Sequence, residues 1–494
     1  MAIKVERVVF ISLILDLFAF TIPLPLFPRI IEWYTVRESA CPNGFLARTL
    51  RLVSVTRNFL LRTPAKNPQK WDIVLLGGFM GSIFSALQFF ISPHIGSFSD
   101  KYGRKRVLLI TMLGNILSAL VWIQSTTFAS YMLSRVIGGL SEGNVQLAIA
   151  ILSDITSAAN RSKALSSVGI AFAICFCIGP PIGAYFASQP LPPNIIQGLE
   201  LNIYATPAAL TLVLLVLETI FLAVALPETR LSQKQEGKSA DFDLDDVSPS
   251  PATSRSVQLR GASVRDRLQL LESLSTAHFL FLGIFSGVEF TLAFLTFDLF
   301  DWNNKQNGAL IGSMGILSAL LQGGYVRRVI PKVGEGVIAR RGVISCFCAL
   351  LLLSAVPRLI DPQNPSSNAA VRALQLSAVF LAYTSATVVN SLTSYASLQC
   401  DDITEDKDRV TGKPKDEHHP NLAKGKALGR FRSRGQLGRA IGPLLACASY
   451  WSFGPSKTYL AGACAMLALM QEMGSLTRTT RARVLKQTAR RSKA

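Results

Sequence analysis

The stretch G-S-F-S-D-K-Y-G-R-K-R, from Gly96 to Arg106, is a short polar segment between two long apolar ones. The apolar segments begin near Ile73 and near Val107, and each approaches the length of about 20 residues with which a helix crosses a bilayer. Glycines let the backbone turn between antiparallel helices, and basic residues gather in cytoplasmic loops. The stretch therefore predicts two membrane-spanning helices joined by a short cytoplasmic loop.

The same pattern repeats along the whole chain, in twelve apolar stretches with six on each side of a polar centre. They begin near Val8, Ile73, Val107, Tyr131, Ala164, Thr206, Phe279, Ala309, Val337, Leu374, Ala427 and Tyr459. Of the 494 residues 49% are hydrophobic and 16% are charged, whereas about a quarter of an ordinary soluble protein is charged. We expect an all-α integral membrane protein with twelve transmembrane helices in two pseudo-symmetric six-helix bundles, and not a soluble enzyme or a nucleic-acid-binding module.

The chain is expected to divide into four parts. Residues 1–226 form the N-terminal bundle, which includes a long outside loop at 28–72. Residues 227–276 form a cytoplasmic linker that is partly disordered, because much of it has too few apolar residues to offset the entropy of ordering. Residues 277–475 form the C-terminal bundle, and residues 476–494 form a basic cytoplasmic tail.

An internal repeat relates the two bundles. Lys163-Ala164-Leu165 precedes Gly179-Pro180 by the same interval at which Lys426-Ala427-Leu428 precedes Gly442-Pro443. Internal duplication is typical of secondary transporters, whose substrate site lies near the membrane midplane between the repeats. The repeat therefore predicts a central substrate cavity.

Basic residues alternate between the loops. The loops at 99–106 and 154–163 carry several Lys or Arg, whereas those at 125–130 and 188–205 carry none. Since Lys and Arg accumulate on the cytoplasmic side, we expect both termini in the cytoplasm. The outside loop at 28–72 departs from this rule with eight basic residues. The expected location is the plasma membrane or an internal organelle membrane.

The loop between the second and third apolar stretches resembles the G-x-x-x-D-x-x-G-R-K/R signature of the major facilitator superfamily. Gly96, Asp100, Gly103, Arg104 and Lys105 occupy every defined position of this signature. The resemblance implies that Asp100 lies near the cytoplasmic N-terminus of the eleventh helix and helps to hold the two halves closed there. A helix N-terminus carries about half a positive charge, which suits this role. A basic turn that only sets the topology is the simpler alternative.

Within that superfamily the chain resembles proton-coupled drug antiporters of the tetracycline-transporter type, and its second half resembles the eukaryotic tetracycline-transporter-like branch. The segments that carry this resemblance are Leu15-Asp16 with Pro25 and Pro28, Gln88 with Pro93, Ser134 to Gly139 with Asp154, Gly179 to Gly183, Gly287 to Leu292, Leu321 to Arg328, and Arg432 to Pro443. Gly179, Pro180 and Gly183 are similar to the G-P-x-x-G antiporter motif, although Ser166 and Cys175 replace its earlier glycines. These residues, and Gly442 with Pro443, are interpreted either as functional bends or as irregularities resolved by packing.

Four ionisable residues within predicted helices are candidates for proton coupling: Asp16, Glu289, Arg135 and Glu142. An ionisable side chain at the bilayer centre costs about 2.5 to 3.5 kcal/mol on insertion scales, so it is a functional candidate by default. Asp16 and Glu289 are the leading candidates, because a carboxyl group removed from water gains a proton more readily. The alternatives are structural: a carboxylate locked to a neighbouring cation or hydroxyl group, and Arg135 in a buried ion pair.

Polar residues at membrane depth are candidates for lining the cavity, namely Gln88, Asn144, Gln146, Gln322 and Asn390. Hydrogen bonds between helices are the equally plausible alternative. Arg439, with Arg135, could make the cavity attractive to organic anions.

Two further groups receive no functional role from the sequence. Arg430, Arg432 and Arg434 are expected to extend to the inner headgroups, and His278 is placed at a helix end.

The sequence thus predicts a secondary active transporter that moves an amphipathic organic solute, drug-like or anionic, by proton-coupled antiport with alternating access. An enzyme is not expected, since no His-bearing constellation lies at membrane depth. No cofactor and no metal are expected, and protons are the expected coupling ion. The expected partners are the lipid bilayer and a small organic solute, with no nucleic acid, and the protein is expected to be a monomer. An uncoupled uniporter of the same fold and a non-transporting receptor or scaffold are the alternatives.

Overall fold

The computed structural model describes residues 4–23, 26–40, 43–60, 68–188, 201–202, 204–229, 264–302, 304–360, 368–400 and 419–491. Within these ranges every regular element is helical. The elements of the first half are α1 (Val5–Thr21), α2 (Phe27–Arg37), α3 (Phe45–Leu60), α4 (Pro68–Tyr102), α5 (Arg104–Ile123), α6 (Phe128–Ser141), α7 (Asn144–Ile155), α8 (Ala158–Ala187) and α9 (Ala205–Ala225). Those of the second half are α12 (Val264–Phe300), α13 (Asn304–Leu320), η2 (Leu321–Val326), α14 (Arg327–Val333), α15 (Glu335–Leu359), α16 (Asn368–Ser397), α17 (Lys424–Phe453) and α18 (Pro455–Arg491).

Together these helical segments form twelve spans in the arrangement that the sequence predicts. Nine spans in the described part are long and apolar enough to cross a membrane, counting α6 with α7 as one and α13, η2 and α14 as another. Helices α1, α17 and α18 pack along these spans and complete two sets of six. Large apolar side chains remain exposed on the helices, including Ile110, Val224, Leu320 and Leu445. Lipid covers such surfaces in a membrane, so the predicted fold class is confirmed.

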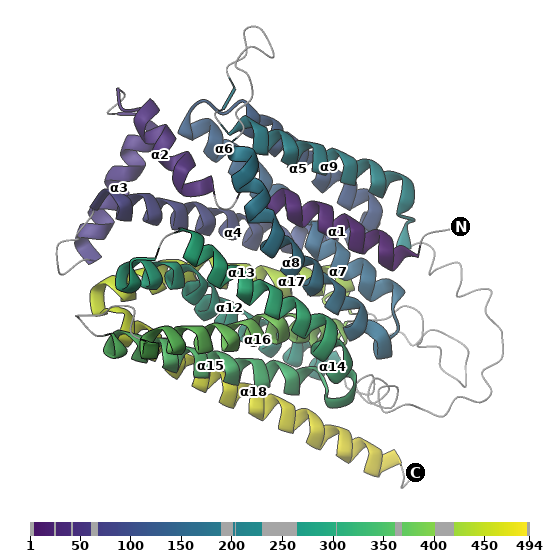
Figure 1. Cartoon of the computed structure of the whole chain (residues 1–494). Helices are drawn as coiled ribbons and strands as arrows, with labels where there is room; N and C mark the ends of the chain where they lie inside the picture. Colours follow the sequence, from purple (N-terminus) through teal and green to yellow (C-terminus); the bar gives the residue numbers. More distant parts are fainter. Residues whose placement is uncertain are drawn as a thin grey trace.

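The two halves form separate bundles (Figure 1). Helices α1 to α9, coloured purple to teal, lie above helices α12 to α18, coloured green to yellow. Each bundle has its own apolar core, and the main contacts between bundles are made by α4 with α17 and by α8 with α13. The site described below lies between the bundles.

Two equivalent corners support the internal repeat. Gly103 joins α4 to α5 with φ 102° and ψ 153°, and Gly334 joins α14 to α15 with φ 98° and ψ 154°. Residues other than glycine rarely adopt this positive φ. Glycine at these corners therefore lets one helix end and the next begin without a longer loop. The signature glycine therefore has a structural counterpart in the second half, one that the predicted repeat did not include.

Two spans are irregular at membrane depth. The fourth span is interrupted at Glu142 and Gly143, between α6 and α7, and Glu142 has an extended backbone with φ −71° and ψ 92°. The eighth span contains the π-helical turn η2, which includes Gln322. Both interruptions were missed from sequence. Irregular backbone within a membrane is tolerated where protein or a cavity surrounds it, and π-helical turns are frequent at functional sites.

Several boundaries differ from those expected. Helix α12 begins at Val264, well inside the predicted linker 227–276, whose residues 230–263 lie outside the described part. Helix α18 continues to Arg491, through most of the predicted tail 476–494. Charged and polar residues extend these helices beyond their apolar segments, so hydropathy alone marks only where they cross the hydrocarbon core.

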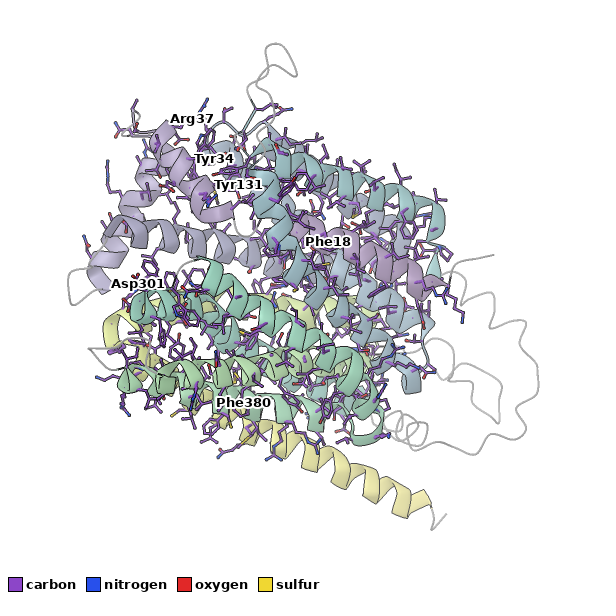
Figure 2. All side chains as sticks on the ribbon, viewed as in Figure 1. Phe18, Tyr34, Arg37, Tyr131, Asp301 and Phe380 are labelled. Atoms are coloured by element: carbon purple, nitrogen blue, oxygen red, sulfur yellow. The ribbon has the colours of Figure 1, made fainter. Side chains whose placement is uncertain are left out.

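The predicted outside loop 28–72 contains two helices, α2 and α3, that pack against α4. The Tyr34 hydroxyl group donates a hydrogen bond to the carbonyl oxygen of Ser125 at 2.8 Å and accepts one from the Asn202 amide at 2.7 Å. Tyr34 also lies beside Tyr131, with 5.8 Å between the ring centroids (Figure 2). These contacts fix α2 onto the first bundle at the end opposite residues 96–106.

Candidate functional site

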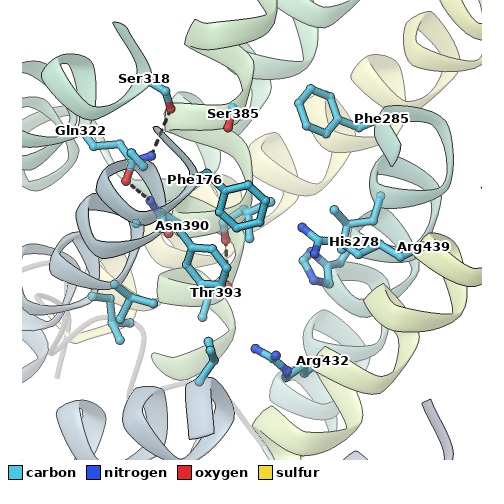
Figure 3. Close-up of a pocket in the computed structure, with 18 of the residues that line it drawn as sticks. Phe176, His278, Phe285, Ser318, Gln322, Ser385, Asn390, Thr393, Arg432 and Arg439 are labelled. Carbon is cyan, nitrogen blue, oxygen red and sulfur yellow. Dashed lines mark hydrogen bonds between the residues drawn. The ribbon is translucent and has the colours of Figure 1, made fainter. Parts of the chain in front are cut away.

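A cavity of about 300 Å³ lies between the two bundles (Figure 3). Helices α7 and α8 of the first half and α12, α13, α16 and α17 of the second half supply its lining, together with η2. The cavity therefore lies where the internal repeat predicts a substrate site.

One wall of the cavity is polar and uncharged. The Gln322 amide donates a hydrogen bond to Ser318 Oγ at 3.2 Å, and the Asn390 amide donates one to Gln322 Oε1 at 3.1 Å (Figure 3). Ser385 and Thr393 of α16 also line this wall. Gln322 and Asn390 thus lie on the cavity as the sequence predicts, and they also bond to one another as the alternative proposes.

The opposite wall carries the charges. Arg432 and Arg439 of α17 and His278 of α12 lie together on this side of Figure 3, and Glu289 of α12 also lines the cavity. The Glu289 side chain is exposed to this space and interacts electrostatically with Arg439. The His278 ring stacks on the Phe431 ring with 4.3 Å between centroids.

Two residues on this wall correct expectations from sequence. Arg432 was expected at the headgroups and His278 at a helix end, yet both line the cavity. The reason is that α12 and α17 begin at Val264 and Lys424, several residues before their apolar segments. Arg432 therefore lies about two turns into α17 and His278 about four turns into α12, deeper than hydropathy indicates.

In Figure 3 the Phe176 ring lies between the amide wall and the charged wall. Phe172 and Phe176 of α8 are stacked with 6.0 Å between centroids, and Phe285 of α12 also lines the cavity. A ligand with an apolar body can bury its surface against these rings, while a polar end contacts one of the walls. The cavity is thus amphipathic, with net positive charge on its charged wall when Glu289 is ionised and His278 is neutral.

A group of three carboxyl groups, here called the acid cluster, lies in the first half beside the cavity. It consists of Asp16 of α1, Glu142 at the interruption of the fourth span, and Glu218 of α9. Asp16 accepts a hydrogen bond from the Asn144 amide at 2.5 Å, and Glu218 accepts one from Ser12 Oγ at 2.7 Å. The three groups interact electrostatically with one another.

Glu218 was not predicted, although it is fully buried. The sequence could have indicated it, because Glu218 is the one charged residue in the apolar stretch that forms α9.

The remaining candidates lie away from the cavity or on its edge. Gln146 lines the cavity and donates a hydrogen bond to the carbonyl oxygen of Ser92 at 2.8 Å. Gln88 is buried in α4 and is not among the lining residues, and Asn144 bonds to Asp16 instead. Arg135 lies over the rings of Trp122 and Tyr131, 5.3 and 5.4 Å from their centroids. Its guanidinium group also donates hydrogen bonds to Ser134 Oγ at 3.4 and 3.5 Å, and no described carboxylate pairs with it.

At the end of the bundle that carries residues 96–106, here called the motif end, the two halves are joined. The Asp100 carboxylate accepts hydrogen bonds from the backbone N–H groups of Gly425 at 3.0 Å and Lys426 at 2.7 Å, at the N-terminus of α17. Arg104 holds Asp100 at 3.0 Å, and a Cβ atom at Gly96 would overlap the carbonyl oxygen of Gly425. The structure thus places Asp100 where the resemblance implies.

Asp154 joins the same contact. Its carboxylate pairs with Arg104 at 2.9 Å and with Lys424 at 3.4 Å, so it links the signature loop to α17. Lys105 instead donates a hydrogen bond to the carbonyl oxygen of Ala223 at 2.7 Å. The signature residues thus make contacts within the first half and also with α17 of the second half.

A second connection at the motif end was not predicted. Ser162 of α8 donates a hydrogen bond to Glu335 Oε1 of α15 at 2.6 Å and lies 2.9 Å from Ser394 Oγ. Arg161 donates a hydrogen bond to the carbonyl oxygen of Ser397 at 3.2 Å. Together with the contacts of Asp100, these contacts join the two halves at the motif end.

The glycine-proline motifs lie in helices that remain continuous. Gly179 and Gly183 of α8 face α1, where a Cβ atom would overlap Thr21 Oγ1 and the carbonyl oxygen of Ile22. Gly442 of α17 faces Gly283 of α12 in the same way. Pro180 and Pro443 lie inside α8 and α17 without ending them. These glycines therefore allow close helix packing inside each half.

Comparison with known proteins identifies the family. A family model described as Major Facilitator Superfamily matches residues 9–402. Major facilitator superfamily domain-containing protein 10 of Mus musculus is 31% identical over 94% of this chain and 91% of its own length, and the Homo sapiens protein of that name is 31% identical over 92% and 89%. The tetracycline resistance protein, class B, of Escherichia coli is 24% identical over 58% of this chain and 64% of its own length.

Solved structures agree with the sequence comparison. The crystal structure of the human organic anion transporter MFSD10 (TETRAN) superposes with a TM-score of 0.73 and 29% identity, covering 95% of this chain and 98% of that one. A proton:xylose symporter of the superfamily shares the fold, with a TM-score of 0.62 and 14% identity over 96% of each chain. With its helical architecture and central cavity, the chain belongs to the major facilitator superfamily and is a membrane transporter, not an enzyme.

Proposed function

We propose that the protein is a secondary active transporter that carries an amphipathic organic anion through the central cavity by alternating access. The observation that carries this proposal is that the Phe176 ring, stacked on Phe172, lies between the amide wall and Arg439 with Arg432 (Figure 3). An aromatic carboxylate or sulfonate matches this arrangement, because its charged end can contact the arginines while its ring lies against Phe172 and Phe176. The similarity to the human organic anion transporter supports the same substrate class.

The conformational cycle follows from the contacts between the halves. The hydrogen bonds of Asp100 and Ser162 hold the motif end closed, so access to the cavity in this conformation comes from the opposite end. Breaking these contacts would open the motif end while the bundles move largely as rigid bodies. We propose that the motif end faces the cytoplasm, because its loops carry the basic residues.

Proton coupling is the proposed energy source. One pH unit supplies about 1.4 kcal/mol per proton, and each 100 mV about 2.3 kcal/mol per charge. Glu289 at the cavity and the acid cluster beside it are groups that could gain and lose protons during the cycle. Exchange against protons is the mode that the resemblance to tetracycline-transporter-type antiporters implies, and co-transport with protons is the other mode open to these groups.

Transport of labelled solutes into proteoliposomes tests the proposal. The assay compares an aromatic carboxylate with an amine and an amide of the same ring system, with empty liposomes as the control. We expect the carboxylate alone to accumulate and to depend on an imposed pH gradient. Equal transport of the amine would contradict anion selectivity, and transport that ignores the pH gradient would favour the uncoupled uniporter.

A further inference from the structure

Arg432 lies between the cavity and the acid cluster. Its side chain lines the cavity (Figure 3). Its charge interacts most strongly with Glu142 and also with Asp16 and Arg439. Within the described part, the structure gives Arg432 no hydrogen bond to a carboxylate, and its buried Nε has no hydrogen-bond partner. The guanidinium group is therefore held near carboxylates by charge while its donors remain available to a ligand.

Among the described residues, the carboxyl groups of the acid cluster outnumber the cations that interact with them. Among the described residues, Arg432 is the cation that interacts electrostatically with Asp16 and Glu142, and Glu218 interacts with those two carboxyl groups. Three neighbouring carboxyl groups, of which Asp16 and Glu218 are buried and Glu142 is partly buried, cannot all remain ionised around a single cation. Some of them therefore hold protons, and the number depends on how much of the charge of Arg432 is available to the cluster.

An anion bound at Arg432 changes this balance. Its negative charge offsets the guanidinium charge that favours ionised Glu142 and Asp16, so the cluster takes up a proton when the anion binds. By linkage the reverse also holds. Protonation of the acid cluster removes negative charge that competes with the anion for Arg432, so the anion binds more tightly. Antiport needs the opposite sign, since there each ligand must favour release of the other.

We infer that the organic anion and a proton bind together, with Arg432 of the second half and Glu142 of the first half as the coupled pair, so that the transporter moves both in the same direction. This inference rests on the proposed function and replaces the antiport predicted from sequence with proton co-transport. Because Arg432 and Glu142 belong to different halves, co-binding also weakens an attraction between the halves that the cycle must change.

The surroundings of the pair agree with this role. The titratable and charged groups that face Glu142 are Asp16 on α1, Glu218 on α9 and Arg432 on α17. Cys175 on α8 adjoins Asp16, while Arg439 and His278 adjoin Arg432. Glu289 and Arg439 form a similar pair within the second half, so variants of Glu142 and Glu289 separate the two possible proton sites.

Proton exchange on binding tests the sign directly. The full-length protein is placed in detergent in a weakly buffered solution with a pH-indicator dye, and an aromatic sulfonate is added. This probe stays ionised across the working range, so any proton change belongs to the protein. We expect net proton uptake that saturates with anion binding, and a Kd that rises with pH, by about tenfold per pH unit in the limit of one proton per anion.

Matched variants locate the proton. Glu142→Gln is expected to bind the sulfonate with a Kd nearly independent of pH and without proton uptake, whereas Glu289→Gln retains the uptake. Glu272→Gln is the control, because Glu272 is exposed and pairs with Arg434 outside the cavity. If Glu142→Gln does not fold, the wild-type measurement still fixes the sign, and Asp16→Asn, which should reduce the uptake, replaces it.

Each outcome decides a different point. Proton release on anion binding, or binding without any proton change, would overturn the inference and leave the anion transporter intact. Proton uptake that persists in Glu142→Gln and disappears in Glu289→Gln would overturn the assigned pair. A protein that binds no aromatic anion would overturn the proposed function and this inference with it.

Discussion

The Asp100 carboxylate of the first half and the Gly425 backbone N–H of the second half are hydrogen-bonded at 3.0 Å. A second bond to Lys426 at 2.7 Å uses the other carboxylate oxygen, so both oxygens face the N-terminus of α17. A helix N-terminus attracts negative charge, and the contact therefore depends on the ionised carboxylate as well as on its hydrogen bonds. This side chain therefore stabilises the closed state of the motif end alongside the contacts of Asp154, Arg161 and Ser162.

Asp100→Asn is expected to weaken closure at the motif end. The amide retains one acceptor oxygen and loses the charge, which we estimate at about 1 to 2 kcal/mol for a partly buried group at a helix N-terminus. Hydrogen–deuterium exchange in the first turn of α17 should accelerate by about 5- to 30-fold. Asp301→Asn is the control, since Asp301 is exposed with φ 53°, a conformation that Asn also adopts. Unchanged exchange in Asp100→Asn would mean that the other contacts alone keep the motif end closed.

The contact at Asp100 is also the part of the site that the sequence predicts best. The signature combines a turn glycine, an acid and two cations at fixed spacing, and each has a local reason to be there. The role of Asp154 in the same contact follows from its place at the end of the fourth span. Ser162 and Glu335, which make the second connection, belong to no such pattern, and only the packing of α8 against α16 and the neighbouring end of α15 brings them together.

The charged wall of the cavity could not be predicted in the same way. Depth in the membrane was judged from apolar segments, so Arg432, about two turns into α17, and His278, about four turns into α12, were placed near the surface. No proline marks the helix interruption at Glu142 in the sequence. The residues beside it make tertiary contacts instead, such as the hydrogen bond between Asn144 and Asp16. Helix depth and interruption are properties of the packed bundle more than of the local sequence.

Gly183→Ala is expected to destabilise the first bundle. A methyl group at this position of α8 would overlap the carbonyl oxygen of Ile22, which is backbone and cannot turn aside as a side chain would. Overpacking of this kind costs about 1 to 3 kcal/mol. Thermal unfolding in detergent measures the loss, with Gly81→Ala as the control, because a Cβ atom at Gly81 meets open space. Equal stability of the two variants would show that α1 moves away from α8 without cost.

Arg439→Gln and Arg135→Gln should differ in anion binding. Arg439 lines the cavity, and hydrogen bonds to charged groups contribute about 1.5 to 3 kcal/mol, so its loss should weaken binding of an aromatic carboxylate by about tenfold to a hundredfold. Arg135 lies over Trp122 and Tyr131, so its substitution should leave the Kd unchanged. Isothermal titration calorimetry compares the two variants. A larger effect of Arg135→Gln would contradict the assignment of the charged wall to α17.

Tyr34→Phe is expected to loosen α2 from the first bundle without changing the cavity. The Tyr34 hydroxyl group bonds to Ser125 and accepts from the Asn202 amide, all three residues are buried, and none of them lines the cavity. Removing the hydroxyl group leaves the buried carbonyl oxygen and amide with fewer partners, which costs about 1 to 3 kcal/mol. Limited proteolysis should therefore cut α2 and α3 more readily in Tyr34→Phe than in the wild type. The Kd for an aromatic carboxylate should not change, because α2 is fixed at the end of the bundle opposite the motif end, and a change in that Kd would instead place α2 in the path of the substrate.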